Sequence, residues 1–335
     1  MKKIIAYIGV VLLITILIPT VIVRTFTFVP RANSVVGEAL EDERPIVKKP
    51  NDIPKPSVDI NYKYKTIKVY NNIKGEVQEL DLEEYVKGVV SAELPAAFHI
   101  EALKAQAIAA RTYAISRVIK YPDGHPDHPS ASICDGIHCQ AYLSFERLSE
   151  MHGESWVKEF WPKIVEAVDS TQNLGIFYNG EIIEPLYHST SGGKTEDVKD
   201  VFSVEQPYLK SVSSPNEEQA PKFRNLITLT IEEFIKKIKG KYPEVNIDKD
   251  NIEEKIKLVD KSTTGRVKKI AIDKKVLDGS VMRDIFGLNS TNFKISLDKK
   301  LSIIEIETYG YGHGVGMSQW GANGMGKAGS TSFDC

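Results

Sequence analysis

The chain has 335 residues, of which 42% are hydrophobic, so it is long enough to bury one large core or two modest ones. Its 43 basic and 45 acidic residues leave a net charge of −2, which excludes the overall basic character of a nucleic-acid-binding protein. Basic residues outnumber acidic ones between residues 221 and 300, and this local excess favours a solvated face over contact with an anionic polymer.

Residues 1–26 are predicted to form a short cytoplasmic tip and a transmembrane anchor. Two lysines precede an uncharged run from Ile4 to Val23, which is long enough to cross the hydrocarbon core of a bilayer. The run lacks an Ala-x-Ala-like cleavage site, so we expect an uncleaved anchor with the later residues outside the cytoplasm. Residues 27–60 are rich in proline and charge and predict an extended linker, followed by an extracytoplasmic domain at 61–330.

Residues 81–121 predict two helices with a break between them. Asp81 and Glu84 have the spacing of a capping box, and Pro95 ends the first helix because it lacks a backbone donor. Glu93 lies at the end of this helix. Apolar neighbours and the negative pole of the helix both disfavour an ionised carboxylate, so we predict a raised pKa and the role of a general acid. The alternative is a solvated glutamate at a helix end.

The rest of the chain alternates short strands and helices. Residues 66–70 and 76–80 predict a hairpin, and Asn179-Gly180 predicts a two-residue hairpin turn. Residues 221–300 contain a second capping-box pattern at Thr230 and Glu233, and we expect a smaller α/β lobe with its own core. The predicted fold class is α+β: mixed helices and antiparallel strands in a main domain with this inserted lobe, after a single N-terminal transmembrane helix.

Three segments are dense in glycine or in polar side chains: residues 187–202, 206–212 and 309–324. They combine hydroxyl, imidazole, amide and aromatic groups, which together suit the hydroxyl groups and apolar ring faces of a sugar. Each segment taken alone is equally well read as a turn whose polar residues are satisfied within the protein.

Cys134 and Cys139 lie in a histidine-rich stretch directly after the second predicted helix. Outside the cytoplasm, a disulfide is the default interpretation of two such cysteines. Zinc is the alternative, because thiolates and imidazoles are the ligands that this ion prefers. Three protein ligands would leave a fourth place for water or substrate, so spacing alone leaves a catalytic metal open. We favour a structural metal.

The motifs SAELPAAF with EALKAQAIAARTYA, then YHSTSGGKTEDV, PYLKSV and GYGHGVGMSQWGA, occur in this order over about residues 61–327. Together they closely resemble the stage II sporulation protein D family, whose domain is shared with an amidase-enhancer group. The resemblance implies a membrane-anchored lytic transglycosylase that cleaves peptidoglycan during forespore engulfment in sporulation. It also implies a single-pass protein of the mother-cell membrane with its C-terminal domain facing the forespore.

The resemblance assigns the catalytic carboxylate to Glu93, the residue singled out above. A lytic transglycosylase needs one carboxylate, because the C6 hydroxyl of N-acetylmuramic acid is the nucleophile and closes a 1,6-anhydro ring. Ordinary glycosidases need two carboxylates, and Glu101 and Glu196 remain open as partners.

The same resemblance suggests the metal ligands, whereas the substrate-binding residues are our own candidates. Some clostridial members have zinc on one histidine and two cysteines, and the matching residues are His128, Cys134 and Cys139, with His125 and His138 less favoured. No organic cofactor is expected. Our candidates for substrate binding are Gln106, Arg111, Tyr187, His188, Ser189, Ser191, His313 and Gln319.

The implied partners are glycan strands stripped of stem peptides and the stage II sporulation proteins P and M. The alternatives to the transglycosylase are a non-catalytic wall-binding enhancer of an amidase and a zinc-dependent hydrolase.

Overall fold

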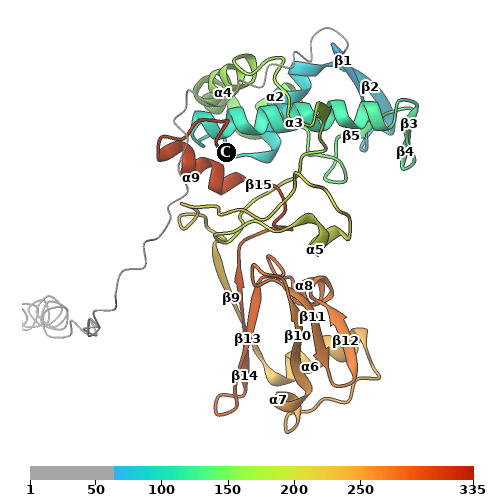
Figure 1. Cartoon of the computed structure of the whole chain (residues 1–335), viewed down its shortest axis with the longest axis vertical. Coiled ribbons are helices and arrows are strands. Elements are labelled where there is room, and N and C mark those ends of the chain that lie inside the picture. The colour runs from blue at the N-terminus through green and yellow to red at the C-terminus, as the bar shows by residue number, and fades with distance from the viewer. Residues whose placement is uncertain (1–63) are drawn as a thin grey trace, which may run out of the picture. The chain divides into compact units, whose positions relative to one another are not determined.

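The computed structural model describes residues 64–335 (Figure 1). The predicted anchor at 1–26 and the linker at 27–60 lie outside the described residues. From residue 64 to the end, no helix is both long and apolar enough to cross a membrane.

The first described elements are a hairpin and two helices. The predicted hairpin is confirmed, since β1 (Thr66–Asn71) and β2 (Glu76–Asp81) pair antiparallel. Helix α2 (Leu82–Glu93) begins after Asp81, whose side chain accepts hydrogen bonds from the N–H groups of the second and third helical residues. It ends at Glu93, because Leu94 is extended and Pro95 follows.

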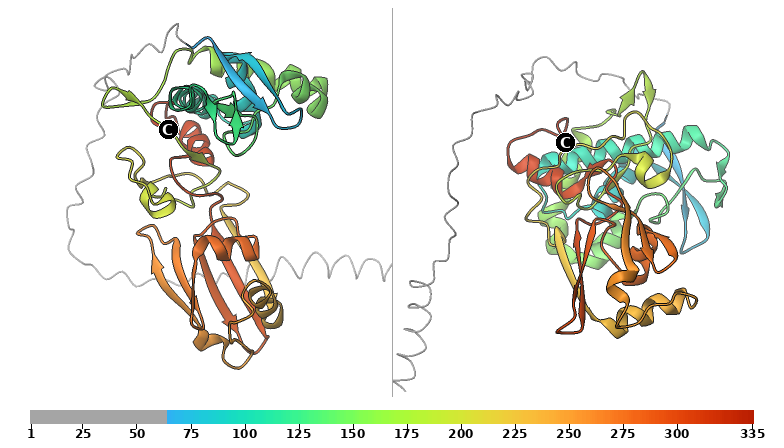
Figure 2. Two further views of the ribbon diagram at one scale, coloured as in Figure 1. Left: turned by 90° about the vertical axis from the view of Figure 1, so that its right-hand side faces the viewer. Right: turned by 60° about the horizontal axis from the view of Figure 1, so that its bottom comes forward.

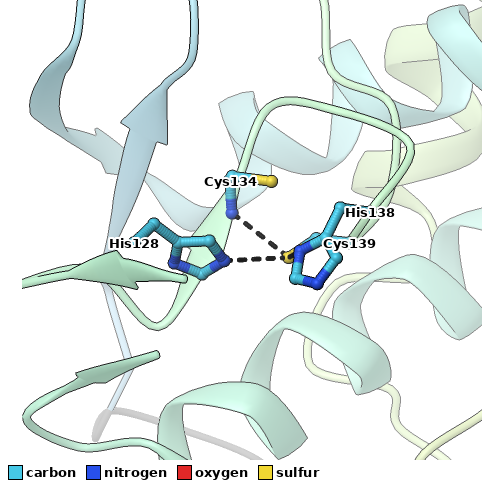
Figure 3. Close-up of side chains that lie close together, drawn as sticks. All are labelled: His128, Cys134, His138 and Cys139. Carbon is cyan, nitrogen blue, oxygen red and sulfur yellow. Dashed lines mark hydrogen bonds between the residues drawn. The ribbon is translucent and has the colours of Figure 1, made fainter. Parts of the chain in front are cut away.

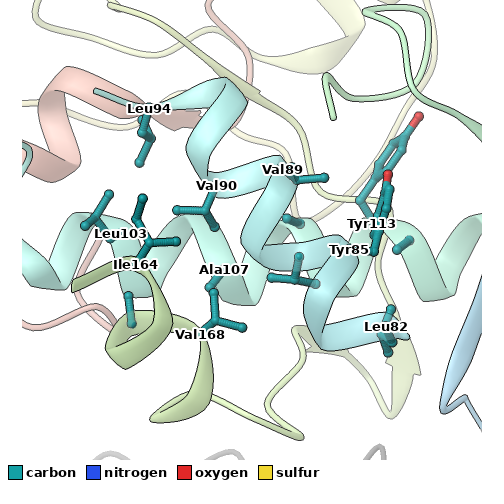
Figure 4. Close-up of a cluster of buried hydrophobic side chains, with 14 of the residues drawn as sticks. Leu82, Tyr85, Val89, Val90, Leu94, Leu103, Ala107, Tyr113, Ile164 and Val168 are labelled. Atoms are coloured by element: carbon teal, nitrogen blue, oxygen red, sulfur yellow. The ribbon is translucent and has the colours of Figure 1, made fainter. Parts of the chain in front are cut away.

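Helix α3 (Ile100–Lys120) and helix α4 (Phe145–Asp169) complete the main core with α2. Val90, Leu103, Ala107, Ile164 and Val168 meet between the three helices (Figure 4). The small residues of α3 allow the close approach of α2, α4 and α9 (Gln319–Lys327), and burying this apolar surface is the main stabilising contribution.

Helix α4 was missed from the sequence. Its pattern is interrupted by Gly153, whose φ of 80° breaks the helix into two segments, and by Pro162. Ser144 caps its start, accepting a hydrogen bond from the N–H of Arg147.

Short strands connect these helices. Most pair antiparallel, including the hairpin of β6 and β7, where Asn179 and Gly180 both have positive φ, as the Asn-Gly turn predicts. Two pairings are parallel, β1 with β5 and β8 with β15, because long stretches of chain separate the paired strands and allow a crossover. The bounds of the remaining elements here are β3 (Gly124–His125), β4 (His128–Pro129), β5 (Ile133–Cys134), β6 (Phe177–Tyr178), β7 (Glu181–Ile182), β8 (Tyr187–His188), α5 (Val198–Phe202) and β15 (Met317–Ser318).

The chain between β9 and β14 folds around a second hydrophobic core (Figure 2). Two antiparallel sheets, in the orders β10-β11-β12 and β13-β14-β9, enclose Phe234, Ile270 and Ile304. The capping box of Thr230 and Glu233 is confirmed at the start of α6. We call residues 224–309 the lobe; its elements are β9 (Arg224–Thr230), α6 (Ile231–Lys241), α7 (Ile252–Lys255), β10 (Ile256–Lys261), β11 (Val267–Ile272), β12 (Lys275–Asp278), α8 (Gly279–Phe286), β13 (Phe293–Asp298) and β14 (Ile303–Tyr309).

A buried arginine joins the lobe to the rest of the chain. The guanidinium of Arg266 donates to the carbonyl oxygens of Ser191 and Gly312, at 3.1 and 3.4 Å. Its Nε lies 3.7 Å from the buried carboxylate of Glu196, which also accepts a hydrogen bond from the hydroxyl of Ser262 at 2.7 Å. The lobe thereby holds the two segments that carry β8 and the glycine-rich stretch before β15.

Candidate functional site

Glu93 is half-buried at the end of α2 and is held by two hydrogen bonds. The backbone N–H of Ala141 donates to Oε1 at 2.8 Å, and the side chain of Gln319 also hydrogen-bonds the carboxylate. Burial raises the pKa of Glu93 above its ordinary value, although both hydrogen bonds oppose the rise. The predicted direction of the shift is thus found, with burial as its main cause. The group can hold a proton at a higher pH than a solvated glutamate can.

Three of the predicted binding residues gather around this carboxyl group. Gln106 on α3 and Gln319 at the start of α9 face one another, with Nε2 of Gln319 3.5 Å from Oε1 of Gln106. Tyr187 of β8 lies close to both Gln106 and Glu93: burial, and then the charge of Glu93, raise the pKa of its hydroxyl well above the ordinary value. Nε2 of Gln106 is a buried donor without a protein partner among the described residues. An acid, two amides and a phenol therefore converge from four elements.

Gln140 completes this group and was missed from the sequence. The hydroxyl of Tyr187 donates to Oε1 of Gln140 at 2.8 Å. Nε2 of Gln140 donates in turn to the hydroxyl of Tyr85 at 3.0 Å and to the carbonyl of Ala110 at 3.3 Å. Gln140 is only 2% exposed. No motif marks it, and its position directly after Cys139 was the one available signal.

The two histidines among the candidates support β8 and β15. Nδ1 of His313 accepts a hydrogen bond from the N–H of Val315, so its Nε2 carries the proton and donates to the carbonyl of Tyr187 at 3.0 Å. Nδ1 of His188 donates to the carbonyl of Val315 at 3.1 Å. Burial lowers the pKa of His188 to about 3 and that of His313 to about 4, so both rings are neutral. They hold the strand that carries Tyr187.

The two candidate serines also make contacts within the protein. The buried hydroxyl of Ser191 donates to Glu217 at 2.8 Å. The hydroxyl of Ser189 lies 3.3 Å from that of Thr190, and its carbonyl accepts a hydrogen bond from the N–H of Trp320. Ser189 therefore anchors the start of α9, next to Gln319.

Arg111 is placed in the core, 1% exposed, where its guanidinium binds the carboxylate of Glu83. The two carboxylates left open as partners of Glu93 are engaged elsewhere. Glu101 pairs with Lys104 and accepts a hydrogen bond from the N–H of Ser332, whereas Glu196 contacts the lobe. Among the described residues, the hydrogen-bond partners of Glu93 are Ala141 and Gln319, and neither Glu101 nor Glu196 is one of them.

A cavity of about 700 Å³ lies elsewhere, beside Ala105, Ile108 and Ala109 of α3. Its lining is mainly apolar and does not include Glu93. Hydrogen-bonding side chains converge instead around Glu93.

The metal-ligand candidates form a compact cluster of four side chains: His128, Cys134, His138 and Cys139 (Figure 3). Their ligand atoms lie within 4.8 Å of one another, and both cysteines are free thiols. Nε2 of His128 is 3.4 Å and Nδ1 of His138 is 3.6 Å from Sγ of Cys139. His138, less favoured from the sequence, thus joins the three predicted residues.

The outer nitrogen of each imidazole is held by an oxygen atom. Nδ1 of His128 donates to the carbonyl of Ala131 at 2.8 Å, and Nε2 of His138 lies 3.1 Å from Oδ2 of Asp127. Histidines that bind metals usually donate their other ring N–H to a carbonyl or carboxylate in this way. Burial raises the pKa of the Cys139 thiol to about 12, so a cation is needed to stabilise its thiolate. The four residues fit a zinc ion in donor type and number.

Known proteins match the chain over most of its length. Residues 70–178, which include Glu93 and the metal cluster, match the family model described as Stage II sporulation protein. The chain is 34% identical to Stage II sporulation protein D of Bacillus subtilis (strain 168), covering 100% of this chain and 93% of that protein. It is also 34% identical to Stage II sporulation protein D of Bacillus amyloliquefaciens, covering 80% and 75%. A more distant relative, the Amidase enhancer of Bacillus subtilis (strain 168), is 27% identical over 73% of this chain and 38% of its own length.

Proposed function

Because the chain belongs to the stage II sporulation protein D family, we propose that it is a peptidoglycan lytic transglycosylase acting in forespore engulfment during sporulation. The observation that carries the proposal is the half-buried carboxyl group of Glu93, with its raised pKa and the polar side chains of Gln106, Gln319 and Tyr187 beside it. Glu101 and Glu196, the two carboxylates considered as its partners in a two-carboxylate glycosidase, make their contacts elsewhere.

The reaction uses Glu93 twice. As an acid, it protonates the oxygen atom of the bond between N-acetylmuramic acid and N-acetylglucosamine, which leaves with the glucosaminyl sugar. As a base, it then takes the proton of the muramyl C6 hydroxyl, whose oxygen closes the 1,6-anhydro ring without consuming water. The raised pKa favours the first step. The hydrogen bonds from Ala141 and Gln319 stabilise the carboxylate that performs the second.

Gln106, Gln319 and Tyr187 are the groups that would orient the sugar. The buried Nε2 of Gln106 has no protein partner in the described part of the chain, so it is a donor ready for a hydroxyl or N-acetyl oxygen. The oxygen of Tyr187, whose proton is directed to Gln140, can accept a hydrogen bond from the neighbouring Gln106 or from a sugar hydroxyl. Amides and a phenol can hydrogen-bond the hydroxyl and N-acetyl groups of a glycan strand.

We propose that the cluster binds a structural zinc ion through His128, Cys134, His138 and Cys139. Bound zinc would stabilise the two thiolates and cross-link the chain on either side of β5. Four protein ligands leave no open position for an activated water molecule, which argues against the zinc-dependent hydrolase.

The cellular context follows from the family and is likewise proposed. The protein would be anchored in the mother-cell membrane by residues 1–26, with its folded part outside the cytoplasm, and would work with the stage II sporulation proteins P and M. The alternative of a non-catalytic amidase enhancer draws on the relative of that name, of which this chain matches 38%.

A matched pair of variants tests the activity. Purified glycan strands are incubated with wild-type protein, Glu93→Gln and Glu101→Gln, and the products are analysed by mass spectrometry. We expect 1,6-anhydro ends from wild type and Glu101→Gln and none from Glu93→Gln. Anhydro products from Glu93→Gln would refute the assignment of the acid, and their absence from wild type would favour the enhancer.

A further inference from the structure

The metal cluster and the proposed acid are connected by three consecutive residues. Cys139 belongs to the cluster, the side chain of Gln140 holds the hydroxyl of Tyr187, and the N–H of Ala141 donates to Glu93. Consecutive Cα atoms are about 3.8 Å apart, so a metal ligand lies within two residues of both contacts. A displacement of Cys139 would therefore also move the N–H of Ala141 that donates to Glu93 and the side chain of Gln140.

Two backbone hydrogen bonds also hold this segment. The N–H of Cys139 donates to the carbonyl of Gly136 at 3.0 Å, and the N–H of Tyr142 donates to the carbonyl of Asp135 at 3.1 Å. Between these residues the chain turns outward into solvent, and Ile137 is 95% exposed. Besides these backbone bonds, the buried side chain of Gln140 and the cluster around Cys139 attach the end of this segment to the rest of the described chain.

Gln140 is suited to placing the groups around Glu93. Its side chain is uncharged, and both ends of its amide form hydrogen bonds. The amide oxygen accepts a hydrogen bond from Tyr187, and the amide nitrogen donates to Tyr85 and to the backbone of α3. Removing the amide would leave two buried tyrosine hydroxyls without this partner. A buried amide with polar contacts on both sides limits the positions that the Tyr187 hydroxyl can take, and catalytic groups must be held within about 0.5 Å of their productive geometry.

We infer that Gln140 is a positioning residue for Glu93 and Tyr187, and that the cluster, when it binds zinc, holds the segment from Cys139 to Ala141 in place. The kinetic part of this inference rests on the proposed function. The part that concerns zinc and the segment does not.

The kinetic part is tested with Gln140→Met, which conserves volume but removes both polar contacts. The control is Thr171→Val, which removes a buried hydrogen bond to Ala167 at the end of α4. On purified glycan strands we expect kcat of Gln140→Met to fall about ten-fold to a hundred-fold with KM nearly unchanged, as for a misplaced catalytic group. Thr171→Val should keep the wild-type kcat. An unchanged kcat, or a loss shared equally by both variants, overturns the positioning role.

The zinc part is tested without turnover. Zinc content and amide hydrogen exchange are measured on the full-length protein, loaded with zinc and then stripped with a chelator. We expect one zinc ion per chain, and stripping should remove the protection of the Ala141 amide while the amide of Leu103, in the core of α3, stays protected. The zinc part is overturned if the Ala141 amide is equally protected in both forms. It is also overturned if the loaded protein contains no zinc, or if stripping removes protection throughout α3. If stripping zinc removes the protection of the Ala141 amide but the protein cleaves no glycan, the proposed function fails and the zinc part of the inference stands.

Discussion

The guanidinium of Arg111 binds both carboxylate oxygens of Glu83, with 2.8 Å from Nε to Oε1 and 2.6 Å from Nη2 to Oε2. This two-point contact joins α3 to α2, and further donors of the guanidinium reach the carbonyl oxygens of Val168 and Leu174. Planar, two-point pairing is the strongest form of ion pair available to arginine. Arg111, a candidate for substrate binding on sequence grounds, therefore packs three segments of the main core together.

Arg111→Met should destabilise the fold while leaving the chemistry of Glu93 in place. The methionine cannot satisfy the carboxylate of Glu83, and breaking a buried pair in this way costs about 3–5 kcal/mol. Urea unfolding at constant pH measures the loss. Lys104→Met is the matched control: it breaks the more exposed pair with Glu101 and should cost less than about 1 kcal/mol. Equal losses for the two variants would contradict a core role for Arg111.

Glu93→Gln should be more stable than wild type at neutral pH. Because burial raises the pKa of Glu93 in the folded state, the folded protein binds more protons than the unfolded chain as pH rises above 4.5. The stability contributed by protonated Glu93 is complete below the unfolded pKa and is lost as pH rises through the folded one. Glutamine cannot ionise, so Glu93→Gln does not lose this stability as pH rises. The free energies of unfolding of Glu93→Gln and wild type should therefore differ at neutral pH and converge below pH 4.5.

The control for this comparison is Glu101→Gln, where the sign is reversed. Hydrogen bonds from Lys104 and Ser332 outweigh the effect of burial and lower the pKa of Glu101. Its contribution to stability is present above the unfolded pKa and is lost as pH falls, so Glu101→Gln should be less stable than wild type at neutral pH. Urea unfolding of all three proteins across the acid range checks both signs. A stability curve of Glu93→Gln parallel to that of wild type would rule out the raised pKa.

Asp127→Asn should weaken zinc binding by about ten-fold to a hundred-fold. The carboxylate of Asp127 holds the outer nitrogen of His138, and loss of such an outer hydrogen bond typically reduces metal affinity by this factor. Competition with a chromogenic chelator measures the affinity. Asp123→Asn, an exposed aspartate in the same loop, should bind zinc like wild type. Unchanged affinity of Asp127→Asn would mean that His138 is not oriented by Asp127.

Gly316→Ala should disrupt the pairing of β15 with β8. The residue has a φ of +74°, and an added Cβ would lie 2.0 Å from the carbonyl oxygen of Leu186. Because β15 leads into Gln319 and β8 carries Tyr187, both unfolding stability and glycan cleavage should fall. Gly240→Ala provides the contrast: its Cβ meets nothing within 4 Å, and alanine in a helix is favoured by about 1 kcal/mol. A stable, active Gly316→Ala would show that the strand pairing tolerates a shift of Leu186.

Local structure could be predicted where neighbouring residues determine it. The start of α2 follows from the capping side chain of Asp81, and the hairpin at Asn179-Gly180 follows from the ease with which these residues adopt positive φ. Helix α4 could not be recognised in the same way. Gly153 and Pro162 weaken its pattern, and tertiary packing of Ile164 and Val168 stabilises it despite them.

By itself, the sequence determined the family, the local elements around Glu93, and the presence of thiols and imidazoles in one short stretch. These depend on residue type and on spacing within a few turns of chain. Only the tertiary structure decided which polar groups reach the acid: Ala141 is 48 residues from Glu93, Gln140 is 47 from Tyr187, and Gln319 is 213 from Gln106. It also directed Arg111 into the core and His138 to the metal cluster. Contacts over such separations depend on how α2, α3 and α9 pack, and no local preference of the chain encodes them.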